Sequence, residues 1–505
     1  MRRTGKGIRA SDLAAATPAT RDRYIDLLRV ASLAVVVLGH WLMAAVTADG
    51  RVGNLLAIVP ALRIATWALQ VMPVFFFVGG FAHALSSRSH PAYDVFVRAR
   101  LRRLLRPTVL FTAVWGAAAL VVQLLGGGSG LTGTALRLVA QPLWFVGVYL
   151  AMVAFTPPLL RLHRRWGWGA FAALAAGAAA VDGLRFAGGV PFVGFLNFGL
   201  VWLAVHQLGF LSADGRLRGR RVPGALAGAG LAGAAALVAL GPYPLSMVGM
   251  PGEAVSNMAP PSLALLCHGV WLVGAVELLR GPGTRLAARA RVWRAVVAAN
   301  GVAMTAFLWH LTAMLGVYGA LLALDVPLPE PATGAWWAQL PPRLVAAAAL
   351  TALLVALFRR AERPGRAAEP GRTKWGAPPA PGRGARGRAA RGRGRASGPV
   401  AAAGVALCLM GVLGLSAVGF AGLLEGRTAV LVAVDVTAPA TVAMILAGWT
   451  LVERSGRRPA PGRAGAPRQD GASQACRSAD AVANDFSAVR SDTWSSASPS
   501  SGSIS

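Results

Sequence analysis

The sequence is poor in cysteine, in acidic residues and in charge as a whole. Cysteine occurs three times, at widely separated positions, so neither a disulfide framework nor a cysteine metal site is expected. Only 14% of the residues are charged, whereas 55% are hydrophobic, and the mean hydropathy is +0.54. This combination excludes an ordinary soluble globular protein and is typical of a polytopic membrane protein. The first 23 residues lack an apolar core, so no cleavable signal peptide is expected.

Long apolar runs, in contrast, recur along most of the chain. A membrane-spanning helix needs about 20 mostly apolar residues. The core of the chain offers such segments at 27–47, 66–86, 108–125, 143–160, 168–184, 192–211, 222–241, 262–280, 296–323 and 343–358. Two more lie at 400–423 and 428–452. The sequence therefore predicts an all-α, polytopic membrane helix bundle with a ten-helix core and a C-terminal two-helix hairpin.

The few charges are distributed unevenly between the two ends of these spans. The chain has 50 Lys and Arg residues against 20 Asp and Glu residues, a net charge of +30. Basic stretches precede the first span and follow every even-numbered span, whereas the opposite loops hold little more than Arg51, Arg137 and Arg185. By the positive-inside rule, both termini are expected on the cytoplasmic side.

Changes in composition divide the chain into five parts. We expect a cytoplasmic basic N-terminus at 1–23, a membrane domain at 24–358, a disordered Arg/Gly/Pro-rich linker at 359–399, a transmembrane hairpin at 400–452 and a disordered tail at 453–505. The linker suits contact with anionic lipid head groups. Topology already explains its charge, so nucleic acid is not expected as a partner. Because a disordered linker forces few contacts, the hairpin is expected to lie outside the ten-helix bundle.

The first span contains an arginine and a histidine, Arg29 and His40. Eleven positions correspond to three helical turns plus about 20°, so both side chains lie on one face, about 16 Å apart. Asp26, three residues before Arg29, is placed to form a local ion pair with it. An ionisable side chain inside a membrane is costly and therefore suggests function. The alternatives are that Arg29 snorkels to the interface and that His40 is a buried, hydrogen-bonded structural residue.

Several stretches resemble the acyltransferase-3 family of bacterial integral membrane acyltransferases. The segment "RDRYIDLLRVASLAVVVLGHW" resembles the family's first helix, on which an Arg, ten residues and a His are the hallmark. "RARLRRLLRP" resembles its arginine motif, with Arg100 and Arg103 as the spaced pair. Further similar stretches are "MPVFFFVGGFAHALS", "PLWFVGVYLAMVAFTPPL", "LVWLAVHQLGFLSADGRL" and "MTAFLWHLTAM". The resemblance covers residues 22–358. The chain departs from many members in lacking a fused hydrolase-like domain and in carrying the extra hairpin.

The resemblance implies an O-acyltransferase in the bacterial cytoplasmic membrane. The donor is expected to be acyl-CoA, with acetyl-CoA the commonest, and the acceptor a hydroxyl of a cell-surface glycan or small molecule. His40 is the implied catalytic residue, and free imidazole titrates near 6.5, which suits a general base. Arginine suits the donor's phosphates, which assigns Arg29, Arg100 and Arg103 to donor binding. Asp26, Trp144, Trp309 and His310 are candidates for the pocket; no bound cofactor and no metal are expected.

Two other classes of protein remain open from the residues alone. A proton-coupled transporter or flippase fits the interior histidines and acids, although we find no inverted repeat of the kind such folds often show. A non-catalytic membrane scaffold that uses its basic linker is the third class. The remaining histidines in or near spans, His83, His206 and His268, are expected to be partnered residues of the bundle.

Overall fold

The computed structural model describes residues 10–362 and 397–455, except 19, 48, 90–92, 128–129, 251, 425 and 432–433. Most of the expected linker and tail, and the first nine residues, lie outside the described part. The boundaries expected there stay predictions.

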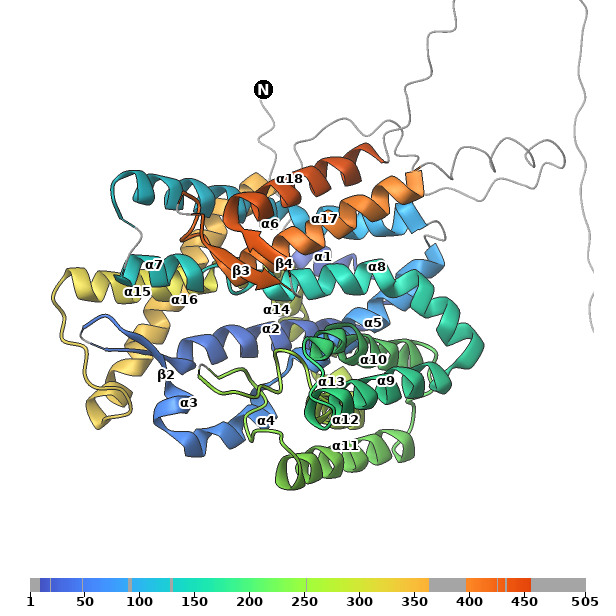
Figure 1. The fold of residues 1–505 in the computed structure, drawn as a ribbon. Coiled ribbons are helices and arrows are strands. Elements are labelled where there is room, and N and C mark those ends of the chain that lie inside the picture. Colours follow the sequence, from blue (N-terminus) through green and yellow to red (C-terminus); the bar gives the residue numbers. More distant parts are fainter. Residues whose placement is uncertain are drawn as a thin grey trace, which may run out of the picture. The chain divides into compact units, whose positions relative to one another are not determined.

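Helices dominate the described residues (Figure 1). They are α1 (Ala10–Ala15), α2 (Arg23–Met43), α3 (Leu55–Ile58), α4 (Thr66–Leu69), α5 (Met72–Ser89), α6 (Tyr93–Leu124), α7 (Gly130–Leu138), α8 (Leu143–Trp166), α9 (Trp168–Phe186), α10 (Asn197–Ala213), α11 (Arg221–Leu240), α12 (Leu263–Leu278), α13 (Arg280–Ala288), α14 (Ala290–Asn300), α15 (Ala303–Ala323), α16 (Gly334–Glu362), α17 (Ser397–Val418) and α18 (Ala438–Arg454). Short 3₁₀ helices span Pro60–Ala65 and Val193–Leu196. Two antiparallel hairpins pair β1 (Ala44–Val46) with β2 (Val52–Asn54) and β3 (Thr428–Leu431) with β4 (Val434–Thr437).

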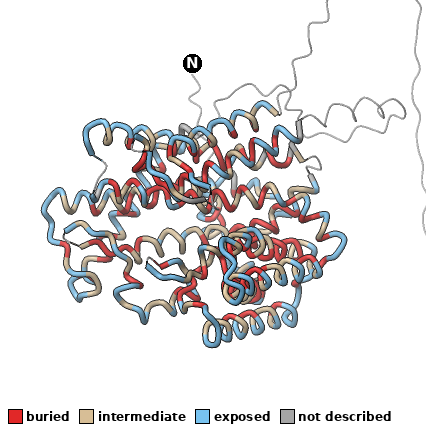
Figure 2. Tube along the Cα trace, in the orientation of Figure 1, coloured by how far each residue is buried: buried red, intermediate tan, exposed pale blue. Residues whose placement is uncertain are grey.

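The described helices confirm the predicted all-α membrane bundle. Ten of them are long and apolar enough to cross a membrane, and α12 with α13, bent by 57°, brings the number to 11. α11 is exposed along most of its length, as Figure 2 shows, although it is strongly apolar. Leu240 is 89% exposed and Val345 on α16 is 70% exposed. Such apolar side chains on the outside of the bundle suit contact with lipid rather than with water.

The structure differs from the expected elements at two places. The basic stretch at 98–106, expected between spans, is helical and belongs to α6, which begins at Tyr93 and continues through Pro107. The last expected span, 428–452, opens with the β3–β4 hairpin, and the helix that follows has 17 residues. The run of valine and threonine in this segment favours extended backbone. Asp435, expected inside a span, therefore lies on β4 and is exposed.

Helices α5, α8 and α10 form the centre of the main core with a group of aromatic side chains. Phe76 packs on Trp202 with ring centroids 4.7 Å apart. α5 and α10 approach each other closely at Gly80 and Gly209, where an added Cβ would collide with the backbone of the facing helix. Small residues at a crossing let two helix backbones come into direct contact. This tight pair supports α2, the first candidate membrane span, which packs on α5.

The C-terminal hairpin packs on the bundle, so the expectation that it stands apart is wrong. α17 lies along α8, and both hairpin helices contact α6 (Figure 1). At Gly147 on α8, an added Cβ would come within 2.5 Å of Leu413 on α17. The backbone N–H of Phe420 donates to Leu136 O at 3.1 Å. The hairpin completes a hydrophobic cluster to which α6 and α8 also contribute.

Candidate active site

Helix α2 carries Arg29 and His40 on one continuous stretch. Asp22 caps its first turn, since the Asp22 side chain accepts a hydrogen bond from Ile25 N at 3.1 Å. A side-chain cap of this kind satisfies one of the free N–H groups at a helix start. The helix ends at Met43, earlier than the span expected from the sequence, so His40 lies in its last turn. Arg29 and His40 therefore stand near opposite ends of α2, about 16 Å apart along its axis.

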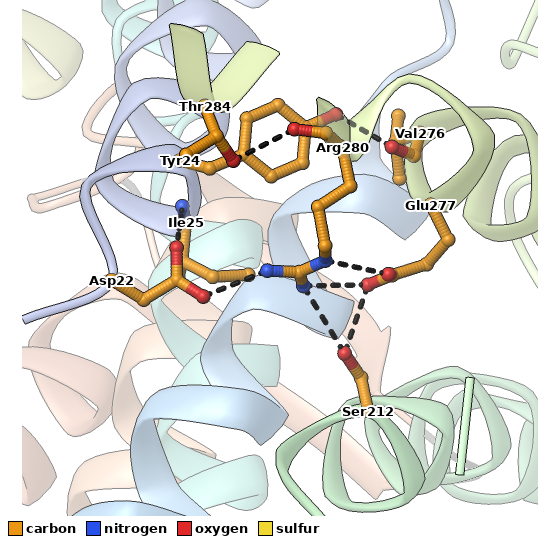
Figure 3. Close-up of polar contacts among 8 residues, drawn as sticks. All are labelled: Asp22, Tyr24, Ile25, Ser212, Val276, Glu277, Arg280 and Thr284. Carbon is orange, nitrogen blue, oxygen red and sulfur yellow. Dashed lines mark hydrogen bonds and ion pairs between the residues drawn. The ribbon is translucent and has the colours of Figure 1, made fainter. Parts of the chain in front are cut away.

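An ion-pair cluster around Arg280 fixes the start of α2 (Figure 3). The Arg280 guanidinium donates to Asp22 at 2.7 Å and to both carboxylate oxygens of Glu277 at 2.7 and 2.8 Å. It also reaches the Ser212 hydroxyl at 3.3 Å, and that hydroxyl donates to Glu277 at 2.8 Å. Two carboxylates hold one guanidinium through charge-assisted hydrogen bonds in this half-buried cluster. The cluster joins α2 to α10, α12 and α13.

Tyr24 strengthens the same junction. Its hydroxyl donates to Val276 O at 2.6 Å, and the Arg280 guanidinium lies 5.4 Å from the centre of its ring. Figure 3 draws the hydrogen bond between Tyr24 and Val276. Gly283 makes room for the ring, since a Cβ there would collide with it. The position of Arg29, one and a half turns further along α2, is set by this junction.

Asp26 forms the ion pair with Arg29 that their spacing predicts. The Arg29 guanidinium lies 3.1 Å from one Asp26 oxygen, and Arg21 donates to the other at 2.5 Å. Asp26 is only 4% exposed, so its carboxylate serves as a fixed anchor for two arginines. About a quarter of the Arg29 side chain stays accessible. The Arg29 guanidinium is thereby oriented without being enclosed.

Arg100 on α6 lies close enough to Arg29 of α2 and to Arg103 for their positive charges to oppose its own. Within the described residues, neither Arg100 nor Arg103 has an ion-pair partner. Their neighbour Arg102 points elsewhere, to Glu453 of α18, with Nε to Oε1 at 2.8 Å.

Arg29 shares the Asp26 carboxylate with Arg21, whereas no described carboxylate pairs with Arg100 or Arg103. Guanidinium groups without a carboxylate favour the binding of a multiply charged anion.

His40 meets His310 of α15. Their nearest nitrogens, His40 Nδ1 and His310 Nε2, are 3.2 Å apart, and their ring centroids are 5.0 Å apart. Trp41, next to His40, donates its indole N–H to His310 O at 3.1 Å and closes the junction between α2 and α15. The structure thus places His310, a pocket candidate, directly against the candidate catalytic residue.

The hydrogen bonds assign a proton to each histidine ring. His310 Nδ1 contacts Phe307 O, which only accepts, so Nδ1 donates and Nε2 carries a lone pair. His40 Nδ1 lies 2.9 Å from Val36 O and faces His310 Nε2, so Nδ1 is again the donor. His40 Nε2 is therefore the unprotonated nitrogen, and it has no hydrogen-bond partner among the described residues. The arrangement leaves one basic nitrogen free for a ligand.

The two tryptophan candidates lie in packed surroundings. Trp309 stacks on Phe358 with centroids 4.0 Å apart and meets Phe111 edge-on at 5.2 Å, so it faces α6 and α16 rather than His40. Trp144, partly buried, packs edge-on against Phe145 at 6.3 Å. Among the described ring contacts, neither tryptophan touches His40 or His310.

The other buried histidines have partners, as expected. Thr156 contacts His83 at 3.1 Å and His206 at 3.2 Å, and Tyr149 lies 3.3 Å from His83. His268 contacts Trp67 O at 2.7 Å. No group of three His, Cys, Asp or Glu side chains in the described part of the chain is arranged to hold a metal ion.

Sequence reasoning missed one buried cation, Arg343 of α16. Its side chain is inside the bundle beside Tyr318 of α15. The available signal was its position: it opens the span at 343–358, at an end where few cations were expected. Counting charges in the expected loops missed Arg343 because it is the first residue of the expected span 343–358, whereas in the structure it lies inside α16.

The comparison with protein families identifies the family of the chain. The family model Acyl_transf_3, described as "Acyltransferase domain", matches residues 22–360, well over half of the 505 residues. The chain belongs to the acyltransferase-3 family. It is a multi-pass membrane acyltransferase, and the transporter alternative is not favoured. The matched region begins at Asp22 and contains Arg29, His40, Arg100 and His310. Searches among curated proteins and among solved structures found no match.

Proposed function

We propose that this acyltransferase moves an acyl group, with acetyl as the expected group, from acyl-CoA to a hydroxyl of a carbohydrate or other small acceptor. His40 acts as the general base. One observation carries this proposal: the hydrogen bonds of His40 leave Nε2 free and basic, on the helix that also positions Arg29. We place the protein in the bacterial cytoplasmic membrane, with both termini cytoplasmic, on the strength of its charge pattern and family.

The reaction needs no covalent enzyme intermediate. His40 Nε2 takes the proton from the acceptor hydroxyl as the oxygen attacks the thioester carbonyl. The C–O bond forms, the C–S bond breaks, and the CoA thiolate leaves with the proton that His40 had accepted. Donor and acceptor become free CoA and an ester, and the histidine returns to its starting state.

The donor fits the arginine group by charge and length. Arg29, Arg100 and Arg103 would bind the phosphates of CoA through charge-assisted hydrogen bonds. The distance of about 16 Å from Arg29 to His40 along α2 is of the order of an extended pantetheine arm. The thioester would then reach His40 from the arginine end, while the acceptor enters from the other end.

His310 is a positioning residue in this proposal. Its Nε2 accepts from His40 Nδ1–H and so fixes the ring with Nε2 toward the substrates. When His40 gains a proton, the same hydrogen bond stabilises the resulting imidazolium. A neutral histidine partner thus performs the orienting part that a carboxylate performs in many catalytic triads.

The test is acyl transfer by purified full-length protein with radiolabelled acetyl-CoA. His40→Ala is expected to remain folded by size-exclusion chromatography and to lose transfer by about 10²–10⁴-fold, the usual contribution of a general base. His268→Ala, which removes another buried histidine, is the matched control and should retain transfer. Near-normal transfer by His40→Ala would rule out the proposed mechanism.

A further inference from the structure

The C-terminal end of α2 is bound to two other helices through one tyrosine hydroxyl. Tyr318 of α15 donates its hydroxyl hydrogen to Ala44 O at 3.3 Å, and the same oxygen accepts from Arg343 of α16 at 3.2 Å. Ala44 directly follows the last residue of α2 and is four positions beyond His40, about one helical turn. The last carbonyl groups of a helix have no partner within that helix. The Tyr318 hydroxyl therefore supplies a partner from another helix, close to the proposed base.

The two hydrogen bonds of the Tyr318 hydroxyl have a fixed direction. A guanidinium donates and never accepts, so the hydroxyl oxygen is the acceptor toward Arg343. Its single hydrogen is then left for Ala44 O, which only accepts. An amide or a second hydroxyl in place of the guanidinium would allow the opposite order. Arg343 therefore determines which way the Tyr318 hydroxyl points.

Arg343 is itself held inside the protein by neutral groups. It is 7% exposed, and its guanidinium also donates to Trp336 O at 2.9 Å and to Gln339 O at 3.2 Å. The rings of Trp336 and Tyr318 lie 5.2 and 5.6 Å from it. None of the ion pairs among the described residues includes Arg343. A buried cation is costly without an opposite charge, and the partial negative charge at the C-terminal end of α2 offsets part of that cost.

The Tyr318 contact is the second one between α15 and the last turn of α2. The first is at His310, which meets His40 Nδ1 at 3.2 Å and accepts from the Trp41 indole N–H at 3.1 Å. Tyr318 lies eight residues beyond His310, about two helical turns along α15. A helix that is bound to its neighbour at two levels cannot slide or rotate against it without breaking a contact. The Tyr318 contact therefore restrains the same turn that carries His40.

We propose that Tyr318 and Arg343 are positioning residues that keep the His40 ring oriented for acyl transfer. This inference rests on the proposed function and extends it beyond the His40–His310 pair. Tyr318 acts on the end of α2 directly, whereas Arg343 acts through the direction that it imposes on the Tyr318 hydroxyl. Neither side chain takes part in the proton transfer itself.

The opposite end of α2 offers a comparison. Tyr24 donates its hydroxyl hydrogen to Val276 O at 2.6 Å, on the stretch of α2 that leads to Arg29. Loss of the Tyr24 hydroxyl should chiefly raise the KM for acetyl-CoA, because it loosens the end of α2 that binds the donor. Loss of the Tyr318 hydroxyl should chiefly lower kcat, because it loosens the end that carries His40.

The experiment measures steady-state transfer from radiolabelled acetyl-CoA by full-length protein in detergent, with a membrane lipid and glycan extract as the source of acceptor. Tyr318→Phe removes only the hydroxyl and should lower kcat about tenfold, since small displacements of a reacting group cost much of its effect. The KM for acetyl-CoA should stay within about twofold of the wild type. Arg343→Met should cause a similar loss of kcat, and Arg343→Lys a smaller one, because lysine keeps the charge but lacks the planar fork.

Tyr243→Phe is the matched control. It removes a similarly buried hydroxyl, which donates to Asp182 of α9 at 3.0 Å, and should retain the wild-type kcat and KM. Thermal unfolding in detergent is measured for both Phe variants and should fall by similar amounts. A loss of kcat in Tyr318→Phe alone would then come from positioning and not from stability.

The same change in the His40→Ala background separates positioning from packing. Without the His40 ring there is nothing to orient, so Tyr318→Phe should leave the residual transfer of His40→Ala unchanged. An equal fold loss with and without His40, or a wild-type kcat in Tyr318→Phe, would overturn the inference. Should Arg343→Met aggregate, Arg343→Lys replaces it, and a wild-type kcat in that variant would remove Arg343 from the proposal. Near-normal transfer by His40→Ala would instead refute the proposed base.

Discussion

In the proposed reaction, the orientation of the His40 ring depends on the hydrogen bond that it donates to His310 on another helix. His310 and Val36 O engage His40 Nδ1, so the ring cannot turn without losing both contacts. Replacing His310 by Ala should reduce kcat for acyl transfer by about 10- to 100-fold, because a base that is poorly oriented loses much of its effect. The KM for acetyl-CoA should stay close to that of the wild type, since His310 lies at the far end of α2 from the arginines.

A conservative variant separates orientation from simple packing. The amide oxygen of Gln can accept from His40 Nδ1–H, so His310→Gln should recover part of the kcat lost in His310→Ala. Equal kcat values for the two variants, or a loss confined to KM, would contradict the positioning role. Steady-state kinetics on detergent-purified protein give both parameters.

The arrangement of Arg29 and His40 on α2 could be predicted from the sequence, but the contact between His40 and His310 could not. Helix periodicity alone places Arg29 and His40 on one face, and spacing alone predicts the Asp26–Arg29 pair. The contact with His310 joins positions 270 residues apart. Such a contact depends on how α2 and α15 pack, and a single sequence carries no direct signal for that. Arg343 was missed for the same reason: its lack of a carboxylate is a property of its surroundings.

Among the helices, α6 directs its arginines to different neighbours. Arg102 pairs with Glu453 of the hairpin, whereas Arg100 and Arg103, one turn apart, join Arg29 without a carboxylate of their own. Residues three apart on a helix, such as Arg100 and Arg103, lie on the same face. Arg102, one residue before Arg103, points to a different side of the helix. Because the first part of α6 is helical, Arg102 points away from Arg100 and Arg103. An irregular loop would not hold the three side chains in these directions.

We expect the triple change of Arg29, Arg100 and Arg103 to Gln to raise the KM for acetyl-CoA at least tenfold. Each lost charge-assisted hydrogen bond contributes about 1.5–3 kcal/mol. Triple replacement by Lys should restore only part of the binding, because lysine lacks the planar fork. Arg165→Gln, at an exposed arginine in the last turn of α8, is the matched control. Unchanged CoA binding by the triple Gln variant would return these residues to a purely topological role.

The ends of an element could be predicted where they coincide with the ends of a long apolar run. They could not be predicted where the helix or strand begins or ends outside such a run. Apolar runs located most of the spanning helices, since lipid demands about 20 such residues. The basic start of α6 was mistaken for a loop because charge marks the membrane boundary and says nothing about where a helix begins. The β3–β4 hairpin was overlooked because apolar valines suit a strand and a span equally well.

On the scale of the whole molecule, the hairpin and the matched domain share one core. Cys408, Val412 and Phe420 of the hairpin region belong to the same hydrophobic cluster as Phe111 and Leu143. Trp309 lies in that cluster too, on the helix that carries His310. Removing the hairpin would therefore leave α6 and α8 without a packing partner on the face beside the arginines.

An ion pair adds to this interface and makes it sensitive to acid. The hydrogen bond from Arg102 lowers the pKa of the Glu453 carboxyl. A carboxyl with a lowered pKa in the folded state stabilises that state above its ordinary pKa, and the contribution is lost as pH falls through the lowered value. For this half-exposed pair the stabilisation is about 0.5–1 kcal/mol. It is small beside the buried apolar contacts of the hairpin.

A chain that ends at Arg366 tests the shared core. Because α17 fills the surface of α8 at Gly147 and α18 binds α6 through Glu453, we expect this shortened chain to unfold at a lower temperature in detergent. We also expect it to lose at least about tenfold in acyl transfer, equivalent to about 1.4 kcal/mol, because α6 would no longer hold Arg100 and Arg103 in place. Glu453→Gln in the full chain is the graded comparison and should cause a smaller loss of both. A shortened chain with wild-type unfolding temperature and wild-type transfer would show that lipid replaces the hairpin without cost and that the ten-helix domain is complete by itself.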